Sequence, residues 1–214
     1  MSSLQKEGGI AAILAAGTYL SGFVLLFTLL APAGYGSDDI DAMRAVAFID
    51  ANIGLMTLWN LVIYVLNAFA LAVLVLALAE RLRPAPVALV SGAFGLMWAV
   101  LVLGAGMIAN VALVAVQQSY AADPQAAETM WTTLTAVENG LGGGNEIAGG
   151  VWVLVTSLAA WRLGVLPKAL NALGLVIGVS GLVTVIPALD AAGAVFGLGF
   201  IVWFLWVGVA LLRG

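Results

Sequence analysis

The chain contains no cysteine and no histidine. Without cysteine it can form neither disulfides nor thiolate metal sites. Without histidine it lacks the usual haem ligand, the commonest zinc ligand and the side chain that titrates near neutrality. No serine or threonine has a base partner that would make it a nucleophile. We therefore predict no metal site, no cofactor and no catalytic residue, and an enzyme is the least favoured class of function.

Charged residues are also scarce. Asp, Glu, Lys and Arg make up 8% of the 214 residues, whereas 64% of the residues are hydrophobic. The apolar residues form runs of about 20, which is the length that crosses a bilayer as a helix. Such runs must be helical, because hydrocarbon offers no partner to an exposed backbone polar group. We predict an all-α polytopic membrane bundle that forms a single domain over residues 1–214. Its six transmembrane helices are expected at residues 9–30, 53–82, 87–117, 145–163, 168–186 and 193–212.

Two further helices are predicted in the loops that follow the first and third transmembrane helices. Ser37, Asp38 and Asp39 supply an N-cap and acidic residues for a first turn, and Asp123 followed by Pro124 is another strong helix start. The segments at about 38–51 and 124–138 each have a terminator and an apolar side. We therefore expect amphipathic helices that lie at the outer surface of the membrane.

The basic and acidic residues fall on different sides of the membrane when successive loops are assigned to opposite faces. Six of the seven basic residues fall on the side of the N-terminus, and nine of the eleven acidic residues fall on the other side. Because basic loops stay in the cytoplasm, the sequence predicts a protein of the bacterial inner membrane with both termini cytoplasmic. The acidic outer face argues against nucleic acid as a partner.

Small residues four apart suggest how the last two transmembrane helices pack. Gly174 and Gly178 lie on the fifth helix, and Gly193 and Gly197 lie at the start of the sixth. Small residues allow two helix backbones to approach closely. With only a short connector between them, these two helices are predicted to pack tightly through Gly178 and Gly197.

A resemblance to a known family rests on a glycine-rich stretch. The stretch Leu141–Trp152 reads LGGGNEIAGGVW and is followed by Leu166, Pro167 and Lys168, while the first helix contains AGTYL at residues 16–20. The chain resembles a group of bacterial multi-pass membrane proteins that are described only as a domain of unknown function. The resemblance implies a six-helix bundle over nearly the whole chain, and it supplies neither a substrate nor catalytic residues.

Polar side chains inside the apolar segments point to a binding site. Thr57, Asn60, Tyr64 and Asn67 are spaced three, four and three residues apart. In a regular α-helix this spacing places all four on one face of the second transmembrane helix. Asn60 is expected about two turns from the outer end, so the face would open toward the outer leaflet.

Two other segments contribute polar groups at a similar predicted depth. Asn110 lies about two turns from the outer end of the third transmembrane helix, and Asn145 and Glu146 begin the fourth. An ionisable group at membrane depth is costly, which makes Glu146 a candidate functional acid. We predict an outer-leaflet ligand-binding pocket lined by Glu146, Asn60, Tyr64, Asn110, Asn145 and Asn67.

Each of these residues also has a purely structural interpretation. Asn145 can cap the fourth helix, and the exposed amides of its first turn favour a carboxylate such as Glu146. The side-chain amides of the other asparagines can form hydrogen bonds between helices. Two classes of function therefore stay open. One is a binding or transport-like protein that admits a small or lipidic molecule from the bilayer. The other is a non-catalytic accessory subunit that packs against a membrane-protein partner or a second copy of the chain.

Overall fold

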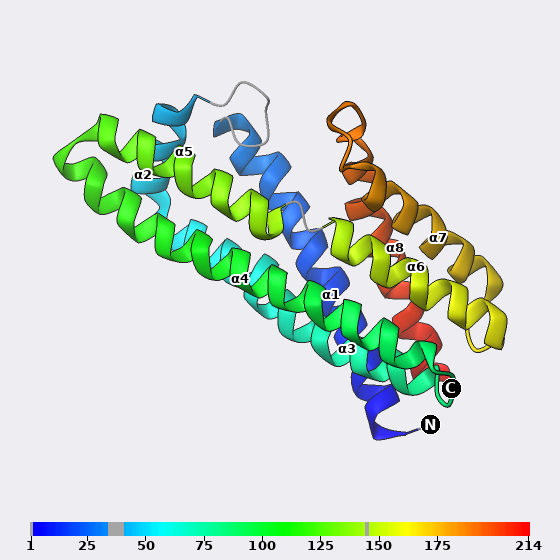
Figure 1. The fold of residues 1–214 in the computed structure, drawn as a ribbon. Coiled ribbons are helices and arrows are strands. Elements are labelled where there is room, and N and C mark those ends of the chain that lie inside the picture. Colours follow the sequence, from blue (N-terminus) through cyan, green and yellow to red (C-terminus); the bar gives the residue numbers. More distant parts are fainter. Residues whose placement is uncertain (1, 34–40, 144–145) are drawn as a thin grey trace. The chain divides into compact units, whose positions relative to one another are not determined.

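The computed structural model describes residues 2–33, 41–143 and 146–214, and within these ranges every regular element is a helix (Figure 1). Asn145 and residues 38–40 of the first predicted outer helix lie outside the described residues. The α-helices are α1 (Ser3–Leu25), α2 (Ala42–Asn60), α3 (Asn67–Arg81), α4 (Val87–Ala122), α5 (Pro124–Glu138), α6 (Glu146–Leu163), α7 (Lys168–Val183) and α8 (Ala192–Arg213).

Some of the described segments that flank these helices have a different helical pitch. η1 (Leu26–Leu30), η3 (Leu61–Leu66) and η4 (Asn139–Gly143) are π-helical. η2 (Ala31–Ala33) and η5 (Pro187–Leu189) are short 3₁₀ turns. A π-turn contains more residues than an α-turn, so the side chains beyond it point in directions that a continuous α-helix would not give.

Five of the described helical stretches are long and apolar enough to cross a bilayer. They are Ser3–Ala33, Ala42–Arg81, Val87–Ala122, Pro124–Leu163 and Ala192–Arg213. The chain is thus a helical membrane protein. Helix α7, which the sequence predicts as a further span, has 16 residues. At about 1.5 Å per residue it is about 24 Å long, somewhat less than a hydrocarbon core of about 30 Å.

The predicted boundary between the first outer helix and the second span corresponds to a break in α2. Asn52 has φ −133° and ψ 27°, outside the helical range, within a helix that otherwise runs from Ala42 to Asn60. The Asn52 side chain donates a hydrogen bond to the Phe48 carbonyl at 3.0 Å. This side-chain bond offers the backbone a partner next to the break.

Helix α5 has the bounds that the sequence predicts for the second outer helix. The Asp123 carboxylate accepts hydrogen bonds from the backbone N–H groups of Gln125 and Ala126, and Pro124 occupies the first turn. The cap satisfies two N–H groups that have no partner inside the helix, and proline loses nothing there because its missing N–H would be unpaired anyway. This local chemistry sets where α5 begins.

The contacts divide the chain into two compact units, and the single domain over residues 1–214 stays a prediction. The first unit comprises Met1–Tyr19, Asn67–Leu101 and Asn145–Gly214, and the second comprises Leu20–Leu66 and Val102–Gly144. Helices α1 and α4 each contribute residues to both units. Sequence periodicity alone does not reveal this division, because α1 and α4 remain apolar across the boundary between the two units.

The core of the first unit is built from aromatic side chains of α4, α6 and α8. Trp98, Trp152, Phe200, Trp203 and Phe204 are fully buried. The ring centroids of Trp98 and Phe200 are 5.0 Å apart, and those of Trp152 and Trp203 are 5.6 Å apart in an edge-to-face arrangement. Aromatic pairs at these separations add favourable interactions beyond the area that they bury.

Helices α6 and α7 approach each other closely through glycines. A Cβ atom placed on Gly178 would lie 2.9 Å from the Gly150 carbonyl oxygen, and one placed on Gly150 would lie 2.9 Å from the Gly178 carbonyl oxygen. Helix α7 packs against both α6 and α8 (Figure 1). Gly178 therefore serves the contact with α6, whereas the sequence analysis assigned it to the contact with the last helix. On α8 it is Gly199 that meets α7, at Ile177.

The two ends of the chain lie at the same end of the first unit. A Cβ atom on Gly9 of α1 would lie 3.0 Å from the Gly208 carbonyl oxygen of α8, and the labelled termini are close together in Figure 1. The first turns of α1 thus pack against the last turns of α8.

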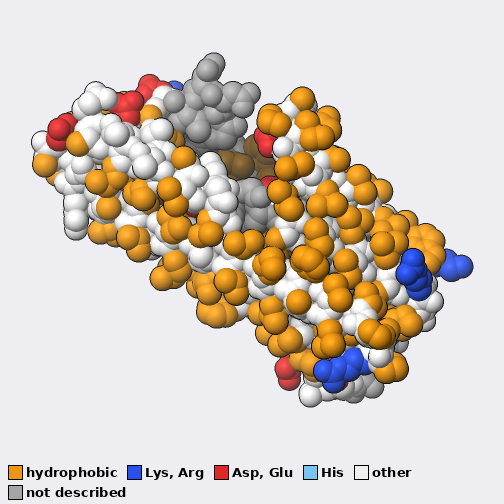
Figure 2. All heavy atoms as spheres, viewed as in Figure 1, with side chains coloured by type: hydrophobic (Ala, Val, Ile, Leu, Met, Phe, Trp, Pro, Cys, Tyr) orange, Lys and Arg blue, Asp and Glu red, His pale blue; other side chains and the backbone are white. Residues whose placement is uncertain are grey.

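Large apolar side chains cover much of the molecular face in Figure 2. Leu89, Val100 and Val111 of α4 have 77%, 67% and 66% of their surface exposed. Extended exposed apolar surface is the mark of a membrane or protein contact. It agrees with the apolar helices in assigning the chain to the membrane.

Candidate functional site

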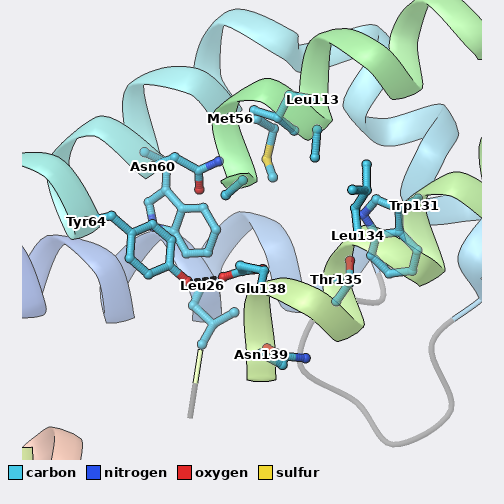
Figure 3. Close-up of a pocket in the computed structure, with 13 residues that line it drawn as sticks. Leu26, Met56, Asn60, Tyr64, Leu113, Trp131, Leu134, Thr135, Glu138 and Asn139 are labelled. Carbon is cyan, nitrogen blue, oxygen red and sulfur yellow. Dashed lines mark hydrogen bonds between the residues drawn. The ribbon is translucent and has the colours of Figure 1, made fainter. Parts of the chain in front are cut away.

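The second unit contains a partly open cavity of about 290 Å³ between α2, η3, α4 and α5, with one residue each from the starts of η1 and η4 (Figure 3). It is lined mainly by apolar and aromatic side chains, together with a few polar ones. The lining residues are Leu26, Met56, Trp59, Asn60, Tyr64, Ala109, Ala112, Leu113, Trp131, Leu134, Thr135, Glu138 and Asn139. Apolar walls with a small number of polar groups are typical of sites for small molecules.

The π-helical segments all contribute to this cavity or adjoin its lining residues. Tyr64 lies within η3, while Leu26 and Asn139 are the first residues of η1 and η4. Asn60 and Glu138 are the last residues before η3 and η4. Irregular turns of this kind occur frequently at functional sites, because they redirect side chains that a regular helix would place elsewhere.

Tyr64 and Glu138 form a hydrogen-bonded pair across the cavity wall. The Tyr64 hydroxyl donates to Glu138 Oε1 at 2.6 Å, as the dashed line in Figure 3 shows. The other carboxylate oxygen, Oε2, accepts no hydrogen bond from the described residues. Gly106 of α4 makes room for the tyrosine, since any Cβ atom at this position would overlap the Tyr64 side chain.

Asn60 presents its side-chain amide to the same cavity. Its side chain is only 4% exposed, and its carboxamide forms no hydrogen bond with the described part of the chain. Figure 3 shows the amide facing the cavity on the side of Tyr64, with Trp131 on the opposite side. The indole N–H of the neighbouring Trp59 is also buried without a partner among the described residues. The Asn60 amide is therefore a group of the cavity wall that can pair with a ligand or with water.

The apolar wall of the cavity is a small core of its own. Leu30, Ile49, Met56 and Leu113 are buried together, and Trp59 and Trp131 pack against them. Rigid indoles held by such a cluster lose little conformational freedom when a ligand binds. The wall is therefore preorganised to accept an apolar group.

The model of a family described as "Domain of unknown function (DUF4386)" matches residues 10–208. The chain belongs to this family. No curated protein and no solved structure matches it. Membership confirms the family resemblance that the glycine-rich stretch indicated. Since the DUF4386 description names no activity, the function has to be argued from the cavity.

In this DUF4386 chain, two of the predicted site residues line the cavity, Asn60 and Tyr64. Asn110 belongs to the same unit but is absent from the lining. Its Nδ2 donates to the Gly106 carbonyl of its own helix at 3.0 Å, and its Oδ1 is buried without a partner in the described chain. The wall of α4 is formed instead by Ala109 and neighbouring apolar residues.

Asn67 and Glu146 belong to the first unit. Asn67 Oδ1 accepts a hydrogen bond from the Thr18 hydroxyl at 3.1 Å, which joins α3 to α1. This is the interhelical bond that the structural interpretation of the amides describes. Glu146 is the first residue of α6, and Asn145 lies outside the described residues. The grouping of Glu146 with Asn60, Tyr64 and Asn110 stays a prediction.

The predicted pocket did not include α5. Trp131, Leu134, Thr135 and Glu138 all line the cavity. Their spacing of three, one and three residues places them on one face of a helix, so the signal was present. Residues 124–138 were predicted as an amphipathic helix at the outer surface of the membrane, and none of them was grouped with the pocket.

Proposed function

We propose that this protein binds a small amphipathic molecule in the cavity of its second unit. The observation that carries the proposal is the Asn60 carboxamide, which lines the cavity, faces it and forms no hydrogen bond with another described residue. A hydrogen bond from the ligand to this amide should contribute about 0.5–1.5 kcal/mol to binding. The cavity volume of about 290 Å³ lies near the lower end of the range for small-molecule sites.

The membrane setting that we propose has six transmembrane segments and both termini on the cytoplasmic side of the bacterial inner membrane. The proximity of Gly9 and Gly208 supports it, because an even number of crossings returns the chain to the side where it began. Helix α7 would then supply the remaining crossing. With this orientation α5 lies at the outer side, and the molecule would reach the cavity from the outer leaflet. The protein would bind this molecule or allow it to pass.

Filling the cavity should abolish binding. The substitution Ala112→Phe places a ring inside the cavity, whereas Val111→Phe places the same ring on the exposed side of α4. In phosphatidylcholine nanodiscs, we expect fluorine NMR to detect saturable binding of 2-(4-fluorophenyl)ethanol to the native protein and to Val111→Phe. Affinity should fall at least about tenfold in Ala112→Phe, a loss of about 1.4 kcal/mol or more.

Equal binding by Ala112→Phe and Val111→Phe would contradict the proposal, because the probe would then be bound outside the cavity. The same conclusion follows if the native protein gives no saturable signal above empty nanodiscs. Melting temperatures of both variants serve as the control for folding.

The orientation predicts which engineered cysteines react from outside the cell, and the absence of native cysteine leaves no background. Cysteines at Gln125 and Asp190 should react with a membrane-impermeant maleimide in intact cells. Cysteines at Ser2 and Ala85 should react only after the membrane is opened. The reverse pattern would invert the orientation, and labelling of Ser2 from outside while Ala85 stays protected would contradict the two crossings predicted between them.

A further inference from the structure

If the cavity binds an amphipathic molecule as proposed above, we infer that the polar end of this molecule is an organic cation, an amine or ammonium group. The inference rests on the charge, the aromatic walls and the free hydrogen-bond acceptors of the cavity. Each of these features selects a cation over a neutral or anionic group.

The first argument is the charge around the cavity. Glu138 is the one charged residue in its lining, and it forms no ion pair with any described residue. The second unit has seven carboxylate residues in its sequence against one basic residue, Arg44. The exposed Arg44 guanidinium donates to the Pro32 carbonyl oxygen at 2.7 Å and is not part of the lining. A cavity lined by charge of one sign concentrates ligands of the opposite sign.

The second argument is the composition of the walls. Trp59, Tyr64 and Trp131 line the cavity, and the faces of aromatic rings attract ammonium groups. A divalent metal ion is a poor fit, because magnesium and calcium require about six or more oxygen ligands. The described residues contain no group of three or more His, Cys, Asp or Glu side chains that could hold a metal ion. An organic cation can use a single carboxylate and place its apolar body against the rings.

The third argument is the supply of acceptors. Tyr64 already occupies Glu138 Oε1, and its hydrogen bond holds the carboxylate in place. Oε2 accepts nothing from the described residues, and the Asn60 carbonyl oxygen is equally unpaired within the same cavity. An ammonium group has only donors, so these two oxygens complement it. An anionic ligand would find no basic partner among the lining residues.

The test compares two probes that differ in their polar group. We would measure the affinities of 2-(4-fluorophenyl)ethylamine and 2-(4-fluorophenyl)ethanol by fluorine NMR in phosphatidylcholine nanodiscs, with empty nanodiscs subtracted. The native protein should bind the amine at least about tenfold more tightly than the alcohol. Glu138→Gln keeps an acceptor for Tyr64 but removes the charge, so this preference should disappear while the alcohol still binds.

Two further variants make the test specific. Glu128→Gln removes a partly exposed carboxylate from the same helix, one that accepts a hydrogen bond from Gln125 and is not part of the lining, and it should keep the full preference for the amine. Glu138→Asp retains the charge and should keep a preference that Glu138→Gln loses. Retained binding of the alcohol reports that each variant is folded.

Failure of the inference differs from failure of the proposed function. If the native protein binds both probes equally, or if the amine preference survives Glu138→Gln, the ligand is not selected as a cation and the inference is overturned. Binding of the alcohol that is lost in Ala112→Phe would still support the proposed function. If neither probe binds, the proposed function fails and the inference fails with it.

Discussion

Replacing Trp98 with alanine should lower the free energy of unfolding by about 3 kcal/mol or more. Trp98 is fully buried in the first unit, with ring centroids 5.4 Å from Trp152 and 5.0 Å from Phe200. Within a bilayer the loss would come mainly from packing contacts, since lipid tails are as apolar as the core. The surrounding rings are themselves held by one another and could not close the resulting cavity. The measurement is unfolding by added denaturing detergent in mixed micelles, followed by circular dichroism.

Trp206→Ala is the matched control for this experiment. Trp206 lies on the same helix as Phe200 and Phe204 but is 39% exposed. Trp206→Ala should lower the free energy of unfolding much less than Trp98→Ala does. If the two substitutions had equal effects, the aromatic cluster would not be the stabilising core of the first unit.

Replacing Gly178 with leucine should destabilise the protein by about 3 kcal/mol, the upper end of the usual cost of overpacking. A side chain here meets the Gly150 carbonyl oxygen at 2.9 Å and the side chain of Leu154. The Leu154 side chain could adopt another rotamer. The Gly150 carbonyl oxygen belongs to the backbone of α6, however, and this backbone could not move away without separating α6 from α7. We expect a clear fall in the melting temperature in detergent.

The control for the glycine experiment is Gly17→Leu in α1. A Cβ atom on Gly17 would have no neighbour within 4 Å, so leucine at this position lacks the clash and improves helix propensity. The melting temperature should stay the same or rise. A fall of equal size in both variants would mean that leucine itself, rather than the close approach of α6 and α7, is responsible.

The helical elements were predictable because their causes are local. Asp123 and Pro124 start α5 through a cap and a fixed φ, and these act within one turn. The break at Asn52 falls where the predicted outer helix gives way to the second span. The prediction did not anticipate the π-helical segments, since the residues of η3, LVIYVL, read as an ordinary apolar helix.

The candidate site was predictable only in part, and one reason is the π-helical segment η3. The spacing of Asn60, Tyr64 and Asn67 implies a single face only if the helix is regular. Because η3 lies between Asn60 and Asn67, Asn60 and Tyr64 line the cavity while Asn67 bonds to Thr18. Glu138 comes from a different helix, and no local pattern pairs it with Tyr64.

The sequence by itself determined that this is a helical membrane protein of the DUF4386 family. Apolar runs without charge can satisfy their backbone groups only as helices, and this constraint acts within each segment. The tertiary structure alone decided that Gly178 meets Gly150 and that Asn60, Tyr64 and Glu138 share one cavity. Such contacts depend on how helices are rotated and paired, and in a largely apolar sequence many rotations bury similar surfaces.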